Sequence, residues 1–369
     1  MKEKPYKSAL KVNEGIEQPP QFNEEARQRF IRHRRKLHTA GQYFEGIQQR
    51  NTAMFSQAIT LVESTLPEHQ AVAQEIIGLC LPFSGKSMRI GITGVPGVGK
   101  STFIDAFGMH LVKQGHRVAV LAVDPSSERS GGSILGDKTR MEELSRQSSA
   151  FIRPSPSAGS LGGVARKTRE SIIVCEAMGY DVILVETVGV GQSETTVYGM
   201  VDFFLLLMLA GAGDELQGIK RGIMEMCDAI FITKADGENL RKAKAATIEY
   251  KNALHLLPKS PSGWEPVTGT CSALTGEGIP EIWETIGNYS TFAKDSGYFT
   301  RRREEQQLLT IRETIHEEIE NHFYRHPEIL KHLPEYEQLV QKQQISGYVA
   351  ARKLLDLYFS RKEAEGDPD

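Results

Sequence analysis

The sequence predicts an α/β fold in which a mainly parallel sheet is flanked by helices, with a helical subdomain before it and a helical arm after it. Between Arg89 and Tyr289, short apolar runs alternate with amphipathic stretches, the pattern of repeated strand–helix–strand units. The segments on either side are charged and carry apolar residues at helical spacing. We therefore expect a helical subdomain over residues 1–84, an α/β domain over 85–290 and a helical arm over 291–369.

Six apolar runs mark the expected strands, which read RIGIT, RVAVLAV, DVILVET, FFLLLML, AIFIT and PVTGTCSA. The run FFLLLMLA at residues 203–210 is too short to cross a bilayer, which takes about 20 residues. We interpret it as a buried strand of a parallel sheet. The N-terminal stretch contains acidic residues and lacks the apolar core of a signal peptide, so we expect a cytoplasmic protein.

Apolar residues also mark one face of each expected flanking helix. These residues are Met54, Ala58, Leu61 and Val62 near the N-terminus, Leu308, Ile311, Ile315, Ile319 and Phe323 in the arm, and Val349, Ala350, Leu354 and Leu355 in the last helix. Because the row from Leu308 to Phe323 lies outside the α/β domain, we expect it to form a two-fold homodimer interface. The alternative is that it packs only on its own subunit, since core helices carry the same pattern.

Composition excludes several classes of function. The 44 basic and 47 acidic residues leave a net charge of -3, which gives no general basic field for nucleic acid or an anionic membrane. We interpret the cluster RHRRK at residues 32–36 as the solvated face of a helix. The four cysteines form no C-x-x-C pair, which favours buried, reduced thiols. His322 and His326 have helical spacing without an acidic neighbour typical of a zinc motif, so we expect surface histidines.

A complete phosphate-binding motif follows the first expected strand. Gly94, Gly99, Lys100 and Ser101 satisfy the pattern G-x-x-x-x-G-K-[ST] between a strand and a helix, as in P-loop NTPases. The residues expected to bind the phosphates are Gly94, Val95, Pro96, Gly97, Val98, Gly99, Lys100, Ser101 and Thr102. Backbone N–H groups and the helix N-terminus would hold the phosphates. Lys100 would bridge the β- and γ-phosphates, and the Ser101 hydroxyl would ligate Mg²⁺.

Two acidic residues follow parallel strands at the same expected edge of the sheet. Asp124 ends the run RVAVLAV, and Glu186 ends the run DVILV. Ligands bind at this edge in open α/β sheets, and Mg²⁺ takes carboxylate oxygens directly or through water. Either acid alone would fit a helix cap or a surface position. Together, beside the phosphate-binding motif, they are metal-site candidates.

The run TKADG at residues 233–237 is the expected base-recognition segment. Asp236 can accept hydrogen bonds from N1–H and the exocyclic amine of guanine, and adenine has no matching donor pair, so this contact selects GTP over ATP. Lys234 would pack over the base. Ser272, Ala273 and Leu274 would complete the pocket. The usual GTPase tetrapeptide starts with Asn, whereas this chain has Thr233, whose hydroxyl can reach the phosphate-loop backbone with a shorter side chain.

Three longer stretches carry a resemblance to a known family. They are DPSSERSGGSILGDKTRM at residues 124–141, ETVGVGQSE, and LAGAGDELQGIKRGIMEMCDAIFITKADG. They closely resemble the GTPase chaperones of adenosylcobalamin-dependent methylmalonyl-CoA mutase, and the resemblance extends from the AITLVES segment to the C-terminal helices. It implies a dimeric GTPase with a helical N-terminal subdomain and a C-terminal dimerisation arm. Methylmalonyl-CoA mutase would be its partner, and GTP, GDP and Mg²⁺ its ligands.

The resemblance also implies three nucleotide-sensing loops. The first would place Asp137 near Mg²⁺, and residues 186–194 resemble the second. Residues 211–220 resemble a third loop that faces the mutase, in which Lys220 is the residue expected to matter for coupling. Such loops are ordered by the γ-phosphate and Mg²⁺ and released on hydrolysis. Gln192 is the candidate for orienting the attacking water, although it is displaced from the position directly after the E-x-x-G glycine. We expect slow intrinsic hydrolysis that the partner accelerates.

Three other functions remain open. One is an ATP-dependent kinase acting on amino-acid transport binding proteins, which Asp236 disfavours because it would select guanine. Another is a metal-insertion GTPase for nickel or cobalt enzymes, which usually carries the Cys/His clusters that this sequence lacks. The third is a scaffold that binds nucleotide without hydrolysing it.

Overall fold

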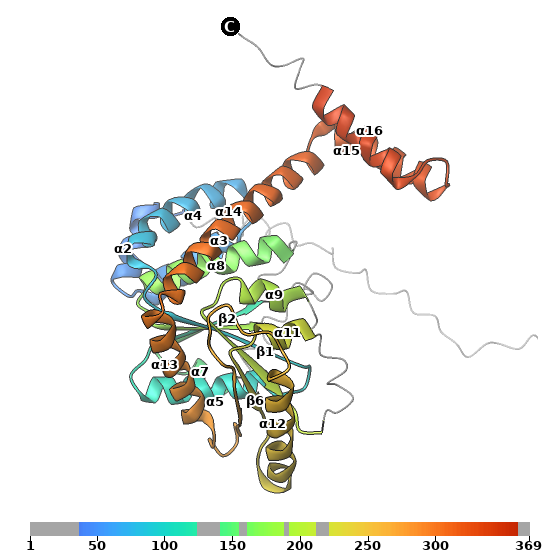
Figure 1. The fold of residues 1–369 in the computed structure, drawn as a ribbon. Helices are drawn as coiled ribbons and strands as arrows, with labels where there is room; N and C mark the ends of the chain where they lie inside the picture. The colour runs from blue at the N-terminus through green and yellow to red at the C-terminus, as the bar shows by residue number, and fades with distance from the viewer. Residues whose placement is uncertain (1–36, 124–140, 155–160, 188–191, 212–220, 361–369) are drawn as a thin grey trace, which may run out of the picture. The chain divides into compact units, whose positions relative to one another are not determined.

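The computed structural model describes residues 37–123, 141–154, 161–187, 192–211 and 221–360. The described residues from Ala40 onward belong to one compact unit, drawn as a ribbon in Figure 1. The basic cluster at residues 32–36 lies outside the described residues.

Seven parallel strands form one sheet in the described part of the chain, in the order β3-β2-β4-β1-β5-β6-β7. They are β1 (Met88–Gly94), β2 (Val118–Val123), β3 (Ala150–Arg153), β4 (Val182–Thr187), β5 (Phe203–Met208), β6 (Ala229–Ile232) and β7 (Val267–Thr270). The central strand β1 pairs Ile90 with Leu184 of β4 and with Phe203 of β5. Because the strands are parallel, the carboxyl ends of β1, β4, β5 and β6 meet at one edge, where open α/β sheets bind ligands.

All six expected strands are confirmed, and the structure adds β3. This strand has four residues and pairs with β2 at the edge of the sheet. Only Ile152 is fully buried among its residues, so the sequence AFIR shows neither a long apolar run nor a clear alternation.

Helices cover both faces of the sheet (Figure 1). The longer ones are α5 (Lys100–Lys113), α8 (Leu161–Ala177), α12 (Leu240–Leu254) and α13 (Ile279–Asp295), and the short ones are α7 (Glu142–Ser145), α9 (Gln192–Tyr198), α11 (Arg221–Met226) and the 3₁₀ turn η3 (Gly237–Asn239). Successive residues of β5 point to opposite faces. Phe203 and Leu205 pack in the core beneath α5 and α13, whereas Phe204 and Leu206 pack in the core beneath α8 and α12.

The N-terminal helices pack into the same core as α8. They are α2 (Ala40–Gln48), α3 (Thr52–Glu63), α4 (Pro67–Cys80) and the 3₁₀ turn η1 (Leu81–Phe83). The Asn51 side chain caps α3 by accepting hydrogen bonds from the backbone N–H groups of Ala53 and Met54. The expected apolar face of α3 is confirmed, with Ala58, Leu61 and Val62 buried, although Met54 is only half-buried.

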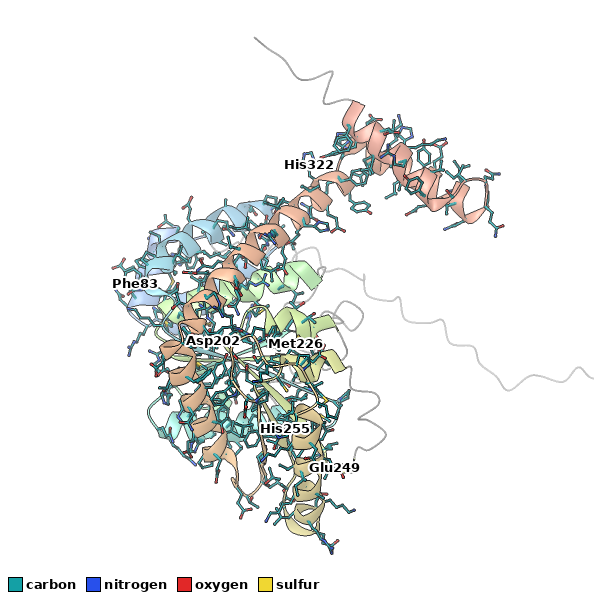
Figure 2. The ribbon with its side chains drawn as sticks, viewed as in Figure 1. Phe83, Asp202, Met226, Glu249, His255 and His322 are labelled. Atoms are coloured by element: carbon teal, nitrogen blue, oxygen red, sulfur yellow. The ribbon has the colours of Figure 1, made fainter. Side chains whose placement is uncertain are left out.

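The C-terminal region consists of α14 (Tyr298–Tyr324), α15 (Pro327–Gln341) and α16 (Gly347–Ser360). Two arginines fix the start of α14 to the sheet. Arg302 is buried and donates to the Val201 carbonyl at 3.1 Å, and Arg303 forms a 2.7 Å ion pair with buried Asp202, which is labelled in Figure 2. Burial and these contacts make the α14–sheet junction part of the folded core.

The exposed apolar row on α14 is shorter than the row expected from the sequence. Leu308, Ile311, Ile315 and Ile319 are all more than half exposed, but Phe323 packs against Ile329, Leu354 and Tyr358 of the following two helices. Phe323 therefore belongs to a small core within its own chain. In the last helix Ala350 and Leu354 are buried as expected, whereas Val349 and Leu355 are exposed.

His322, labelled in Figure 2, is exposed as expected. Its Nδ1 lies 2.7 Å from the Tyr358 hydroxyl. The helices that the structure describes include none with the length and apolar character needed to cross a membrane. The domain boundaries after residues 84 and 290 stay predictions. Helix α13 continues to Asp295, and the chain turns into α14 at Gly297, whose φ of 71° favours glycine.

Candidate nucleotide-binding site

The phosphate-binding motif forms the loop (residues 94–99) that joins β1 to α5. Gly94 has a φ of 156°, and a Cβ built there would lie 2.4 Å from the Leu207 carbonyl oxygen, so close strand packing excludes a side chain. Gly99 precedes the first residue of α5 with a left-handed φ of 94°. The loop therefore ends at a helix N-terminus whose free N–H groups favour an anion.

Lys100, the first residue of α5, is buried and points back along the phosphate loop. Its Nζ donates to the Gly94 carbonyl at 2.7 Å and approaches the Val95 carbonyl at 3.4 Å. Burial lowers the pKa of Lys100, and the negative charges of Glu186 and Glu194 oppose that shift. A partly desolvated ammonium group that is held by carbonyls and faced by carboxylates is suited to receive a phosphate.

Two oxygen donors meet at the edge of the sheet beside the phosphate loop. The Ser101 hydroxyl lies 3.4 Å from the Glu186 carboxylate at the end of β4. One residue further, the Thr187 hydroxyl donates to the Thr93 hydroxyl at 2.9 Å, which ties the ends of β4 and β1 together. A hydroxyl and a carboxylate form an oxygen donor set that fits Mg²⁺. The two other metal candidates, Asp124 and Asp137, lie outside the described residues.

Helix α9 brings a further acid to this region that the sequence did not single out as a site residue. Glu194 is 2% exposed, and its carboxylate lies 3.4 Å from the Ser193 hydroxyl. Its charge acts on Lys100, although the two residues are far apart in the sequence. The E-T-T run after Gln192 gave no reason to expect burial. Gln192 is the first residue of α9, but its side chain is not among those that the structure describes. Lys220 lies outside the described residues.

The base-recognition segment lies directly against the phosphate loop. Buried Thr233 donates through Oγ1 to the Val98 carbonyl at 2.8 Å and approaches the Met208 carbonyl at 3.3 Å. Lys234 is exposed, has a left-handed φ of 54°, and its Nζ donates to the Gly97 carbonyl at 2.9 Å. The strained backbone at Lys234 is held by Asn239, whose side-chain amide donates to the Lys234 carbonyl at 2.7 Å.

Asn239 was not expected from the sequence, because its role depends on the turn after Asp236. That turn, η3, brings residue 239 back to the segment from which the base contact would come.

Asp236 and the loop after β7 meet as expected. The buried Ser272 hydroxyl donates to Asp236 Oδ2 at 2.6 Å and accepts from the Thr275 backbone N–H at 3.2 Å. This bond fixes one carboxylate oxygen and leaves the other oxygen of Asp236 able to accept from a ligand. Ala273 is half-buried, and Leu274 is 82% exposed.

The cysteines play no visible part in this site. All four are buried, as expected, and burial raises the pKa of Cys80 to about 12. Within the residues that the structure describes, His, Cys, Asp and Glu side chains form no cluster of three or more that could hold a metal ion.

Comparisons with known proteins agree with this geometry. Residues 55–328 match the sequence profile of the family described as "Methylmalonyl Co-A mutase-associated GTPase MeaB". The chain is 49% identical over 286 residues to "GTPase ArgK" of Escherichia coli, an alignment that covers 78% of this chain and 86% of the relative. It is 46% identical over 328 residues to "Methylmalonic aciduria type A homolog, mitochondrial" of Mus musculus, which covers 86% of this chain and 79% of that protein.

A solved structure described as "Crystal structure of LAO/AO transport system kinase" resembles this fold. Its TM-score is 0.69 at 38% sequence identity, and the match covers 88% of this chain and 99% of that chain.

Proposed function

The chain belongs to the family of methylmalonyl-CoA mutase-associated GTPases, and on this premise we propose that it is a chaperone of adenosylcobalamin-dependent methylmalonyl-CoA mutase. In this role it gates cofactor loading and protects and reactivates the mutase. The observation that carries the proposal is the family match over residues 55–328, which includes the phosphate loop, the base-recognition segment and α14. Methylmalonyl-CoA mutase is therefore the partner against which the chain should be tested.

Guanine selection rests on the pair of Asp236 and Ser272. The 2.6 Å hydrogen bond from Ser272 uses one lone pair of the carboxylate and orients it, so that its two oxygens can face the N1–H and the amine of guanine without a search over rotamers. The Lys234 ammonium donates to the Gly97 carbonyl of the phosphate loop, and the aliphatic part of this side chain would pack on the base. Adenine would leave the Asp236 charge without donors, which is costly in a partly buried site.

Phosphate binding rests on Lys100 and on the backbone of residues 94–102. On nucleotide entry the Lys100 ammonium exchanges the Gly94 and Val95 carbonyls for β- and γ-phosphate oxygens. Ser101 and Glu186 would hold Mg²⁺, together with Asp124 and Asp137. When bound, Mg²⁺ neutralises charge that develops on the phosphate oxygens during transfer. Gln192, the first residue of α9, would orient the attacking water.

Nucleotide state is expected to reach the partner through α9 and the loop at residues 211–220. Glu194 of α9 acts on Lys100, so a change in the position of Lys100 changes the electrostatic environment of this helix. Lys220 is the proposed coupling residue of the third loop. GTP and the mutase would then change each other's affinity by the same factor, as linkage requires.

A homodimer through α14 is the second part of the proposal. Leu308, Ile311, Ile315 and Ile319 are spaced to lie along one side of α14, and each is more than half exposed. The opposite side of the helix carries Arg302, Arg303 and Glu317, which contact the rest of the chain. The apolar row is exposed while the other side of the helix is held by the rest of the chain. This arrangement supports a homodimer in which a second copy of the chain covers the apolar row.

The competing function is phosphoryl transfer to a protein, and the observation that supports it is the likeness to a solved structure described as a transport system kinase. The two functions differ in where the γ-phosphate goes. A chaperone GTPase releases it as inorganic phosphate, whereas a kinase attaches it to an acceptor protein.

We place the chaperone in the cytoplasm, although the mouse relative carries the word mitochondrial in its name.

The decisive experiment mixes the full chain with purified methylmalonyl-CoA mutase and a non-hydrolysable GTP analogue, GDP or ATP. We expect co-purification of the mutase whose extent depends on the guanine nucleotide and does not respond to ATP. Radiolabelled γ-phosphate should appear as inorganic phosphate, faster when the mutase is present. Equal capture in every nucleotide state, or label transferred to protein, would reject the chaperone mechanism.

A further inference from the structure

A cavity of about 820 Å³ lies away from the nucleotide site, between α4, α8 and the first half of α14. This volume falls in the range of sites that hold small organic molecules. Its wall includes Leu81, Arg169, Ile173, Gln306 and Thr310. None of these residues belongs to the phosphate loop, the metal candidates or the base-recognition segment, so the proposed function leaves the cavity unexplained.

Buried polar atoms without a hydrogen-bond partner are concentrated at this cavity. Among such side-chain atoms in the described residues, four belong to Arg166, Arg169 and Gln306, which all line it. Arg166 Nε is compensated by the Glu317 carboxylate at 3.4 Å. The atoms that remain are Nε and Nη2 of Arg169 and Oε1 of Gln306. Buried polar groups are nearly always paired in folded proteins, so this concentration is unusual.

The two unpaired atoms of Arg169 indicate one chemical group that a ligand of this cavity would carry. Its Nη1 already binds Glu313, which fixes the guanidinium by one corner. Nε–H and Nη2–H lie along the same edge of a guanidinium, and this edge is the fork that accepts both oxygens of a carboxylate. Both atoms are covered in the free protein, so the guanidinium must turn toward the cavity to present this edge.

Gln306 indicates a second chemical group that the ligand would carry. Its Nε2 donates to the Val201 carbonyl at 2.8 Å, and this bond fixes which way the amide points. Oε1 has no donor and, like the two atoms of Arg169, is covered in the free protein, so the amide must shift toward the cavity to accept from a ligand. An ammonium group is the strongest donor that a small molecule can offer. Leu81, 55% exposed, and half-buried Ile173 provide an apolar surface between the polar groups.

The charges around the cavity select the net charge of the ligand. Arg166, Arg169 and Lys167 carry three positive charges, and four negative ones are carried by Glu170, Glu313, Glu317 and Glu318. Arg89 and Arg303, also on the wall, are paired with buried Glu176 and Asp202. The cluster has one excess negative charge, which disfavours a ligand with a net negative charge, whereas a ligand with one charge of each sign leaves the balance unchanged.

We propose that this cavity is a binding site for a small zwitterion with an apolar side chain, of the amino-acid type. The carboxylate binds the Nε/Nη2 edge of Arg169, the ammonium donates to Gln306 Oε1, and the side chain packs on Leu81 and Ile173. This site is separate from the nucleotide site and does not rest on the proposed partner.

The test is calorimetry of the full chain, saturated with GDP, against L-norleucine. Two analogues isolate the charges, since L-norleucinamide lacks the carboxylate and hexanoate lacks the ammonium. We expect norleucine to bind with one site per chain and each analogue to bind at least about tenfold more weakly, the loss expected when a hydrogen bond to a charged group is removed. Absence of binding at millimolar norleucine, or equal binding of either analogue, would overturn the proposal.

Variants locate the site. Arg169→Gln should weaken norleucine binding at least about tenfold, whereas Arg146→Gln, whose side chain is 76% exposed next to α7, should leave it unchanged. Because Arg169→Gln also breaks the contact with Glu313, a second variant, Ala71→Trp, fills the cavity from an exposed position on α4. Norleucine binding that survives in Ala71→Trp would place the ligand elsewhere and reject this site.

Discussion

The Thr233 hydroxyl donates a 2.8 Å hydrogen bond to the Val98 carbonyl, so the base-recognition segment and the phosphate loop are directly tied. The tie uses the one position at which this chain departs from the usual Asn of GTPases. Both residues are buried, which makes the bond insensitive to solvent competition.

Thr233→Val should therefore weaken GTP binding and lower the free energy of unfolding, each by about 1–3 kcal/mol, because the Val98 carbonyl loses its donor in a buried position. Thr233→Ser keeps the hydroxyl and is the matched control. Calorimetry with GTP and a chemical denaturation curve provide the two readouts. A Ser variant as weak as the Val variant would show that the methyl group, and not the hydrogen bond, is what matters.

Asp236→Ala should reduce the preference for GTP over ATP by about 2–4 kcal/mol, since guanine loses two buried hydrogen bonds to a carboxylate. Ser272→Ala should have a smaller effect in the same direction, because it removes only the bond that orients Asp236. The measurement is the affinity for GTP and ATP in each variant. Equal affinity of the parent protein for both nucleotides would reject the guanine assignment.

Asp228 gives the protein a pH dependence that arises far from the nucleotide. This carboxylate is buried, accepts from the Phe204 backbone N–H at 2.9 Å, and burial raises its pKa from 3.8 to about 7. The folded state therefore binds this proton more tightly than the unfolded state. The stability from the proton is fully present below pH 3.8 and is lost as the pH rises through about 7.

Relative to Asp228→Asn, the free energy of unfolding of the parent should fall between about pH 4 and pH 7 and stay level above about pH 8. Other titrating groups are common to both proteins and cancel in the difference. Denaturation curves at each pH give the measurement. A constant difference across the range would mean that Asp228 is ionised in the folded protein throughout.

Ile315→Glu should convert the proposed homodimer to a folded monomer, because Ile315 is 54% exposed in the chain and a glutamate there would place a charge in the proposed interface. Lys331→Glu, an exposed change on α15, is the control. Light scattering reports the mass and circular dichroism the fold. A parent protein that is monomeric at micromolar concentration would contradict the dimer directly.

Lys220→Ala should reduce the acceleration of GTP hydrolysis by methylmalonyl-CoA mutase while leaving nucleotide binding without the mutase nearly intact. The physical reason is that residues 211–220 include charged side chains but none of the expected phosphate- or base-binding residues. Hydrolysis rates of parent and variant, with and without purified mutase, test it. Equal stimulation in both proteins would remove this loop from the coupling mechanism.

The sequence by itself determined the central sheet and the place of the candidate phosphate loop between a strand and a helix. The motif with Gly94, Gly99 and Lys100 occurs where a strand ends in a loop before a helix. A continuous apolar run such as FFLLLM is typical of an inner strand of a parallel sheet, where neighbouring strands accept and donate its backbone hydrogen bonds. Asp236 and Ser272 were also predictable, because both follow strands whose carboxyl ends meet at the same edge.

Tertiary structure alone decided the contacts between residues that no local pattern links. Burial of Glu194 near Lys100 depends on how α9 packs on the sheet, and the role of Asn239 depends on the turn that returns it to Lys234. Phe323 has the same spacing as Ile319, yet only the packing of α15 and α16 covers it. Likewise the cavity at Arg169 exists because α4, α8 and α14 meet without filling the space between them, and side-chain volumes across three helices are not encoded in any one segment.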